Sequence, residues 1–319
     1  MGLGRYLMKR SIIAVLLIFL VATINFVIVH ITPGGPQSIF VLNPHVSVAA
    51  RQLMLAQFGL TKPLYVQYEI YIVGMFTGHW GISYFYNEPA FQVIAQRVPA
   101  TLLLMVPSLI LTILVGIVLG VLGARRPFSF VDRFLSSTAF FFYAMPAFWL
   151  GFVLLTVFVL FLHVLPASGM TSVSGGGSVP DILTHMILPV FSLTLVNLAN
   201  FSLLMRSSLM EVMDQNYITT AKGKGLSERL IFFRHAMRNA LLPTVTMTGL
   251  FVGFLLTGAI LTESVFNWPG LGLLTFQSIE QRDYPIILSL FFIFSIMIIV
   301  ANLVTDVLYG FLDPRISFD

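Results

Sequence analysis

The 319-residue sequence contains no cysteine. This absence excludes a disulfide framework, a thiolate metal site, an iron–sulfur cluster and a cysteine nucleophile. Charge is also scarce, because Lys, Arg, Asp and Glu make up 9% of the residues, against about 25% in an ordinary soluble domain. Since 57% of the residues are hydrophobic and the mean hydropathy is +0.94, so few charged side chains cannot coat soluble domains. The composition predicts a polytopic membrane protein.

Long uncharged runs locate the membrane spans. A helix needs about 20 mostly apolar residues to cross the hydrocarbon core. Six runs without Asp, Glu, Lys or Arg meet this condition once their Gly-, Pro- and Ser-rich ends are trimmed. A shorter run over 70–87, interrupted by glycines, predicts an interfacial helix that leads into a loop. The sequence therefore predicts an all-α membrane protein with six transmembrane helices, over 11–31, 98–124, 134–163, 182–205, 239–262 and 284–305.

The distribution of basic residues orients the chain. If the N-terminus is cytoplasmic, the inner segments hold all but four of the 17 Lys and Arg residues. Cytoplasmic loops of membrane proteins carry this excess of positive charge, so both termini are expected inside. The first apolar run exceeds a signal-peptide core and is not followed by an Ala-x-Ala site, which favours an uncleaved span. The four outer basic residues are Arg51, Lys62, Arg97 and Arg282.

Four regions follow from this topology. Residues 1–31 form the N-terminus and first span, and 32–96 form a long external segment with an amphipathic helix around Val46–Phe58. Residues 97–310 form the membrane core, and 311–319 form a cytoplasmic tail. Within the core, the Gly- and Ser-rich stretch 164–181 is expected to be a flexible external loop.

The cytoplasmic segment 206–240 carries nine of the thirty charges. Asn216 is expected to cap a short helix and Gly225 to end it in the left-handed conformation. A second helix then follows, so that two short helices are joined by a glycine turn. On one face of this second helix lie Leu226, Leu230, Phe233 and Met237.

Three interpretations apply to this unit. A basic helix–turn–helix can enter a DNA groove, but membrane spans tether both of its ends, which argues against a nucleic-acid partner. It can lie on anionic lipid headgroups. The interpretation we favour is a docking element for a soluble cytoplasmic partner, because apolar and charged residues alternate on a short, rigid unit.

The sequence contains no motif for chemistry of its own. There is no P-loop, no His-Glu-x-x-His and no Gly-x-Ser-x-Gly, so no catalytic, cofactor or metal site is predicted. The spans also lack the buried charges of proton and ion relays, since Glu263 and Asp306 stand at span ends. Polar residues within the spans either line an uncharged pathway or form hydrogen bonds between helices. The pathway candidates are Asn197, Asn200, Thr246 and Thr257.

Residues 217–243 resemble the coupling motif of ABC importer permeases. Thr219-Thr220-Ala221, three further residues and Gly225 correspond to its first half, and Ala240-Leu241-Leu242-Pro243 to its end. The longer spacer resembles the dipeptide/oligopeptide/nickel subfamily, and further motifs in the same order resemble its B-type permease subunit. These are Thr32–Pro36, Phe58–Leu64, Gly78–Ser83, Arg97–Leu102, Pro146–Gly151, Glu263–Gly272, Arg282–Pro285 and Leu312–Arg315.

The resemblance implies a type I ABC importer permease in a prokaryotic inner or plasma membrane. Such a chain forms half of a channel with a homologous second permease, above two cytoplasmic ATPases that bind ATP and Mg, while an external solute-binding protein delivers the cargo. No cofactor is implied for this chain itself. The residues implied to contact an ATPase are Tyr217, Thr219, Thr220, Ala221, Lys222, Gly223, Lys224, Gly225 and Leu226.

Two other classes compete with this interpretation. A self-sufficient secondary carrier or channel predicts a charge within a span and uptake by the isolated chain. An embedded enzyme predicts a catalytic constellation. The cargo stays open among dipeptides, longer peptides, nickel chelates, glutathione and oligosaccharides, because specificity resides largely in the binding protein.

Overall fold

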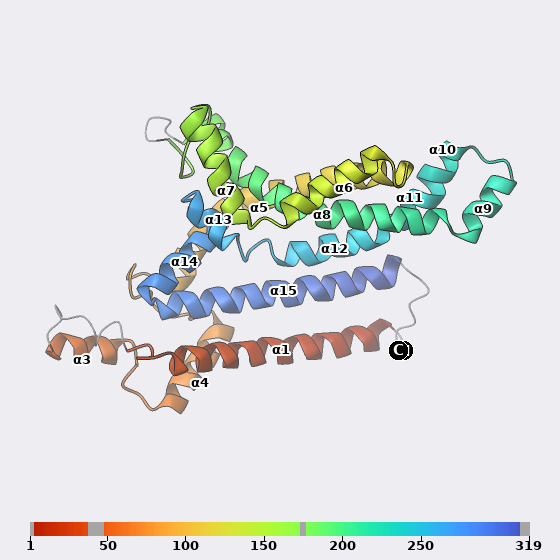
Figure 1. Ribbon diagram of the computed structural model, residues 1–319. Coiled ribbons are helices and arrows are strands. Elements are labelled where there is room, and N and C mark those ends of the chain that lie inside the picture. Colours follow the sequence, from red (N-terminus) through yellow and green to blue (C-terminus); the bar gives the residue numbers. More distant parts are fainter. Residues whose placement is uncertain (1–2, 38–47, 173–176, 313–319) are drawn as a thin grey trace.

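The computed structural model describes residues 3–37, 48–172 and 177–312. Within these ranges the chain consists of helices and connecting turns, and its β-structure is limited to an isolated bridge between Ile82 and Pro89. The long helices lie side by side along one direction (Figure 1). This confirms the expected all-helical class.

In the described part of the chain, four helices are long and apolar enough to cross a bilayer. They coincide with four of the six predicted spans, and each is extended at one or both ends. Because hydrogen bonds within a helix satisfy the whole backbone, such uninterrupted runs are suited to lipid. The four are α1 (Leu3–Ile31), α5 (Ala90–Arg125), α8 (Val179–Met213) and α15 (Tyr284–Leu312).

The predicted span 134–163 is not one straight helix. It comprises α6 (Phe130–Tyr143), α7 (Ala147–Leu154) and the π-helix η1 (Leu155–Phe161), and the two parts meet at 96°. Pro146 stands at the break. Proline lacks a backbone N–H and disfavours helical geometry in the residue before it, so the sequence ends α6 here. This pair forms either one bent span or a re-entrant segment.

The predicted span 239–262 also differs from a single long helix. Helix α12 (Leu242–Gly253) has 12 residues, which extend about 18 Å, short of the roughly 30 Å hydrocarbon core. Turns follow until α13 (Ile260–Val265), and Gly258 among them has φ of +66°. The expectation of an unbroken helix over 239–262 was therefore wrong, because a left-handed glycine interrupts the apolar run.

Helices α5 and α8 pack closely through small residues. A Cβ atom on Gly116 would lie 2.6 Å from Cβ of Phe201, and one on Gly120 would lie 2.7 Å from Cβ of Met205. Only glycine allows the two backbones to approach this far. Lipid gives little hydrophobic drive for association, so such close van der Waals contact is what holds membrane helices together.

Helix α1 lies beside α15 and contacts α4 (Leu64–Thr77). Ala22, Met75 and Phe292 are buried where these three helices meet. Helix α4 ends at the left-handed Gly78, so a helix that leads into a loop within 70–87 is confirmed, while its interfacial position stays a prediction. The amphipathic helix expected around Val46–Phe58 is α3 (Val48–Gln57).

Buried Asp283 attaches the chain after α4 to the junction of α14 (Leu271–Gln281) with α15. Its carboxylate accepts hydrogen bonds from the Ser83 hydroxyl and from the backbone N–H groups of Tyr84 and Phe85, the last two at 3.1 and 3.3 Å. A buried carboxylate needs such partners. Asp283 therefore fixes a segment that precedes it by about two hundred residues in the chain.

Different helices lie at the two ends of the molecule. The start of α1, the end of α15 and helices α9–α11 lie at one end, whereas α3 and α14 lie toward the other (Figure 1). The expected tail 311–319, apart from the last two residues of α15, and part of the expected loop 164–181 lie outside the described residues.

Candidate functional site

Between α8 and α12 the chain forms two short helices, which we call the basic hairpin (residues 216–240). The first is α9 (Asn216–Gly223), and the second is a continuous run of α10 (Glu228–Leu230), η2 (Ile231–Ala236) and α11 (Met237–Ala240). Gly225 lies between them with φ of +74°, so the expected left-handed glycine turn is confirmed. Asn216 was wrongly expected to be the N-cap, because Gln215 occupies that position.

The hairpin has an apolar interior. Ile218 and Ala221 of α9 pack with Ile231 and Ala236 of η2 against Leu209 at the end of α8. The apolar face that the sequence predicted for the second helix is not the buried one. Of its residues, Leu226, Leu230 and Phe233 are exposed and Met237 is only partly buried. The π-helix explains this difference, because its i→i+5 bonding turns Ile231 and Ala236 to the same side. Exposed apolar side chains are thus left on a charged unit.

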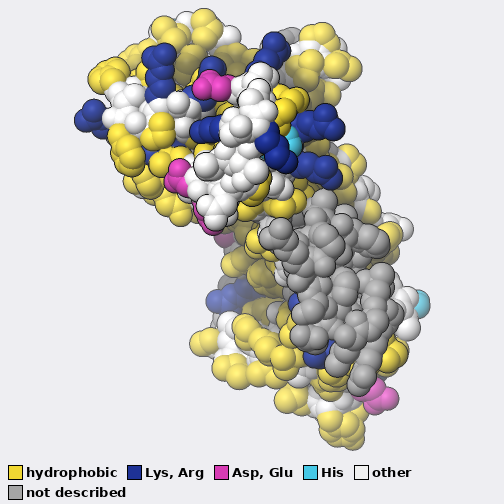
Figure 2. Space-filling model, turned by 90° about the vertical axis from the view of Figure 1, so that its right-hand side faces the viewer, with side chains coloured by type: hydrophobic (Ala, Val, Ile, Leu, Met, Phe, Trp, Pro, Cys, Tyr) yellow, Lys and Arg dark blue, Asp and Glu magenta, His cyan; other side chains and the backbone are white. Residues whose placement is uncertain are grey.

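The nine predicted coupling residues lie on α9 and the turn that follows it. Eight of them are exposed and only Ala221 is buried. The Tyr217 hydroxyl accepts a hydrogen bond of 2.9 Å from the Asn239 side chain, which joins the two helices of the hairpin. Viewed from this end, the surface gathers Lys and Arg side chains with few acidic ones (Figure 2). The hairpin is therefore internally fixed and outwardly basic.

Two of the four pathway candidates line one cavity. Asn197 of α8 and Thr257, in the turns after α12, border a space of about 240 Å³ between α5, α8 and α12. Ser108 and Thr112 of α5 add hydroxyl groups to the same lining. The side-chain amide of Asn197 already donates to the Leu193 carbonyl at 2.9 Å. Its amide oxygen and second N–H group remain available to a solute.

A second, larger cavity of about 740 Å³ lies between α6, α8 and α12, and Asn200 lines it. Asn197 and Asn200 are about one turn apart on α8, as are Phe251 and Met247 on α12. Asn197 and Phe251 line the smaller cavity, whereas Asn200 and Met247 line the larger one. The cavities therefore follow one another along α8 and α12. Thr246 lines neither of them, and its hydroxyl donates to the Leu242 carbonyl at 3.2 Å.

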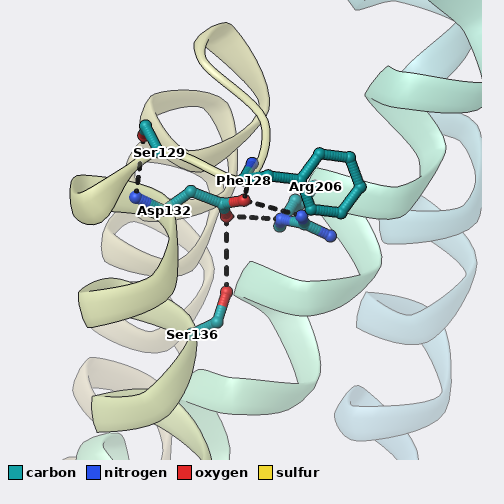
Figure 3. Close-up of polar contacts among 5 residues, drawn as sticks. All are labelled: Phe128, Ser129, Asp132, Ser136 and Arg206. Carbon is teal, nitrogen blue, oxygen red and sulfur yellow. Dashed lines mark hydrogen bonds and ion pairs between the residues drawn. The ribbon is translucent and has the colours of Figure 1, made fainter.

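The ion pair drawn in Figure 3 borders the larger cavity on its hairpin side. Arg206 of α8 donates from Nε and Nη2 to the two carboxylate oxygens of Asp132 on α6, at 2.5 and 2.7 Å. Asp132 also accepts from the Phe128 backbone N–H at 2.7 Å and from the Ser136 hydroxyl at 3.4 Å. Two parallel bonds between guanidinium and carboxylate form the strongest kind of ion pair. The pair fixes α6 to α8.

Sequence reasoning did not anticipate this pair. Arg206 counted only as a cytoplasmic charge, and Asp132 stands just before a predicted span. The one local signal was the Ser-x-x-Asp spacing of Ser129 and Asp132, which marks a helix start. Ser129 is indeed the N-cap of α6 and accepts from the Asp132 N–H. Among the described residues, no group of three or more His, Asp or Glu side chains is placed to hold a metal ion.

Membrane-length helices, a groove of two consecutive cavities along α8 and α12 and a structured hairpin at one end are the features of a membrane transport component. The family model "Binding-protein-dependent transport system inner membrane component" matches residues 116–318, and the corresponding N-terminal family matches residues 3–105. The chain belongs to this family of ABC importer permease subunits and is not an enzyme in its own right.

Relatives extend along nearly the whole chain. The oligopeptide transport system permease protein AppB of Bacillus subtilis is 36% identical over 99% of this chain and 100% of its own length. The dipeptide transport system permease protein DppB of Escherichia coli is 37% identical over 93% of this chain and 94% of its own length. The glutathione transport system permease protein GsiC of Escherichia coli is 36% identical over 98% of this chain and 99% of its own length.

A solved structure of the MetNI methionine ABC transporter in inward-facing conformations shares the fold. It aligns with a TM-score of 0.54 at 15% identity, over 70% of this chain and 97% of the other. The fold is therefore that of an ABC importer permease.

Proposed function

We propose that this chain forms half of the translocation pathway of an ATP-driven importer for peptides. Its relatives are named for oligopeptide, dipeptide and glutathione transport, which supports a peptide-type cargo. None of these names supports an oligosaccharide. The second half of the pathway would be a homologous permease. ATP and Mg would bind to two partner ATPases, and an external solute-binding protein would deliver the cargo.

The basic hairpin is the observation that carries this proposal. Its buried interior holds α9 in place while Thr219, Thr220, Lys222 and Lys224 stay exposed to a partner. We infer that α9 and the turn through Leu226 lie in a groove on one ATPase. Since Ile218 and Ala221 pack against the end of α8, movement of α9 would be transmitted to that helix. Closure of the ATPases would then rock α8 and the groove beside it.

The cargo would move along the groove between α8 and α12. The cavity near the hairpin has about 740 Å³ and the next about 240 Å³, so the groove is wider toward the hairpin. This taper supports an inward-open arrangement, in which Asn197, Asn200 and Thr257 offer uncharged hydrogen-bonding groups to a peptide backbone. Thr246 is less well placed for this role.

In the proposed topology the chain has six spans, with the bent α6–α7 unit and the α12 region as the third and fifth, in an inner or plasma membrane. The start of α1, the end of α15 and the hairpin share one end of the molecule, which supports cytoplasmic termini (Figure 1). Residues 32–96 would form the external scaffold that meets the binding protein. An impermeant maleimide applied to intact cells should label Lys62→Cys but not Lys224→Cys. The reverse pattern would invert the topology.

Native mass spectrometry of the gently extracted, tagged chain tests the assembly. We expect a complex with a second permease and two P-loop ATPases, and peptide uptake by proteoliposomes that depends on internal ATP. If the chain stays alone or forms only homo-oligomers after crosslinking, and takes up solute without ATP, it is a secondary carrier or channel instead.

A further inference from the structure

A third cavity, of about 510 Å³, opens where the basic hairpin joins α12. Arg234, His235 and Arg238 line it, and none of its lining residues is acidic. No described carboxylate forms an ion pair with either arginine. The cavity thus presents two uncompensated guanidinium groups, whose forked N–H donors match the oxygens of a phosphate.

The opposite wall of this cavity is apolar. It is formed by Leu241, Leu242 and Val245, and Val245 on α12 is 42% exposed. Arg238 is the last charged residue before the uncharged run 239–262. The cavity therefore spans the change from charged to apolar sequence, which is the level at which phospholipid headgroups meet the hydrocarbon core.

The cationic wall is held in position. The Asn239 side-chain amide donates to the Tyr217 hydroxyl at 2.9 Å and to the His235 carbonyl at 3.2 Å. Both Tyr217 and Asn239 line the cavity, so the bond between them ties its α9 wall to its η2–α11 wall. A ligand would meet this wall largely formed, and pre-organisation of this kind favours binding.

We propose that this cavity binds the phosphate headgroup of an anionic phospholipid, with one acyl chain along Val245. Arg234 and Arg238 would bind the phosphate oxygens, and the Tyr217 hydroxyl, which accepts from Asn239, would donate a further hydrogen bond to them. The apolar wall favours a lipid over a carboxylate of a soluble partner, which would have no use for it. The site shares only Tyr217 with the proposed ATPase contact, so both can be occupied together. A bound lipid would connect the hairpin to the membrane surface.

The test titrates the delipidated, assembled complex in native mass spectrometry with dioleoyl phosphatidylglycerol or dioleoyl phosphatidylcholine. Wild type should bind the anionic lipid preferentially. Because each Lys or Arg near an anionic surface contributes about fivefold in affinity, the Arg234→Gln/Arg238→Gln variant should bind it about 25-fold more weakly. Arg126→Gln, an exposed cation outside this cavity, should bind it like wild type. Arg234→Lys/Arg238→Lys retains the charge but lacks the forked donors, so it should bind more weakly than wild type and more tightly than the glutamine variant. This intermediate affinity separates loss of charge from misfolding.

Three outcomes of the titration would overturn the proposal, and a competition experiment adds a fourth. The first is equal affinity of wild type and the double glutamine variant for phosphatidylglycerol, and the second is equal binding of the two lipids by wild type. The third is release of the ATPases by the glutamine variant with its lipid binding intact, which would assign the arginines to a subunit contact. Glycerol phosphate serves as competitor. Displacement only at concentrations far above that of the lipid supports a lipid site, and displacement at equal concentration overturns it in favour of a free-phosphate site.

Discussion

The hydroxyl of Thr101 on α5 donates a hydrogen bond of 3.2 Å to the carboxylate of Glu263 on α13, which has no exposed surface. The same carboxylate accepts the Leu273 N–H at 3.0 Å, and Thr101 accepts the Leu271 N–H at 2.6 Å. These donors belong to the first turn of α14, where unpaired N–H groups favour an anion. One acidic side chain thereby joins α5, α13 and α14.

Replacement of Glu263 by alanine should destabilise the protein by about 3 kcal/mol or more, because buried donors left unpaired cost about 1–3 kcal/mol each. Thermal unfolding of the detergent-solubilised chain measures the effect. Glu280→Ala provides the control, since Glu280 is an exposed acid on the same α14 helix. Equal unfolding temperatures for the two variants would show that Glu263 does not hold these helices together.

Asp132 and Arg206 should behave as a coupled pair. Asp132→Leu alone should cost about 3–5 kcal/mol, because it leaves Arg206 without its partner, whereas Asp132→Leu combined with Arg206→Met should recover much of this loss. The unfolding free energies of both single variants and the double variant give the coupling energy. Arg133→Met changes a neighbouring arginine in the same cavity and should have little effect on stability. A coupling energy near zero would contradict the pairing.

Gly225 should matter for coupling more than for assembly. Valine at φ of +74° costs about 1–2 kcal/mol of backbone strain, and relief of that strain would displace α9. We therefore expect Gly225→Val to lower peptide uptake per ATP hydrolysed in a complex that still assembles. Gly225→Asn is the matched control at the same position, because asparagine tolerates the left-handed conformation and a Cβ there meets nothing within 4 Å. Uptake at wild-type efficiency by Gly225→Val would refute the geometric requirement.

Sequence patterns predicted the structure correctly where it depends on interactions between residues close together in the chain. Four long spans and the left-handed Gly225 could be predicted because hydrophobic length and a missing Cβ act within a few residues. Patterns failed where tertiary contacts decide. Neither the pairing of Asp132 with Arg206 nor that of Thr101 with Glu263 has a periodic signal, since 74 and 162 residues separate the partners. Pro146 was visible in the sequence, but the 96° bend beside it depends on packing.

The natural absence of cysteine allows a direct test of the groove between α8 and α12. A cysteine at Asn197 or Thr257 should react with a small hydrophilic thiol reagent, because both positions border the same cavity. A cysteine at Ser192, on α8 but fully buried, should stay unreactive, since buried thiols are inert. Modification at Asn197 should block uptake, and bound peptide should slow the reaction. If Asn197→Cys and Ser192→Cys reacted at the same rate, the cavity would not be a path for polar solutes, and Asn197 would serve only its bond to Leu193 within α8.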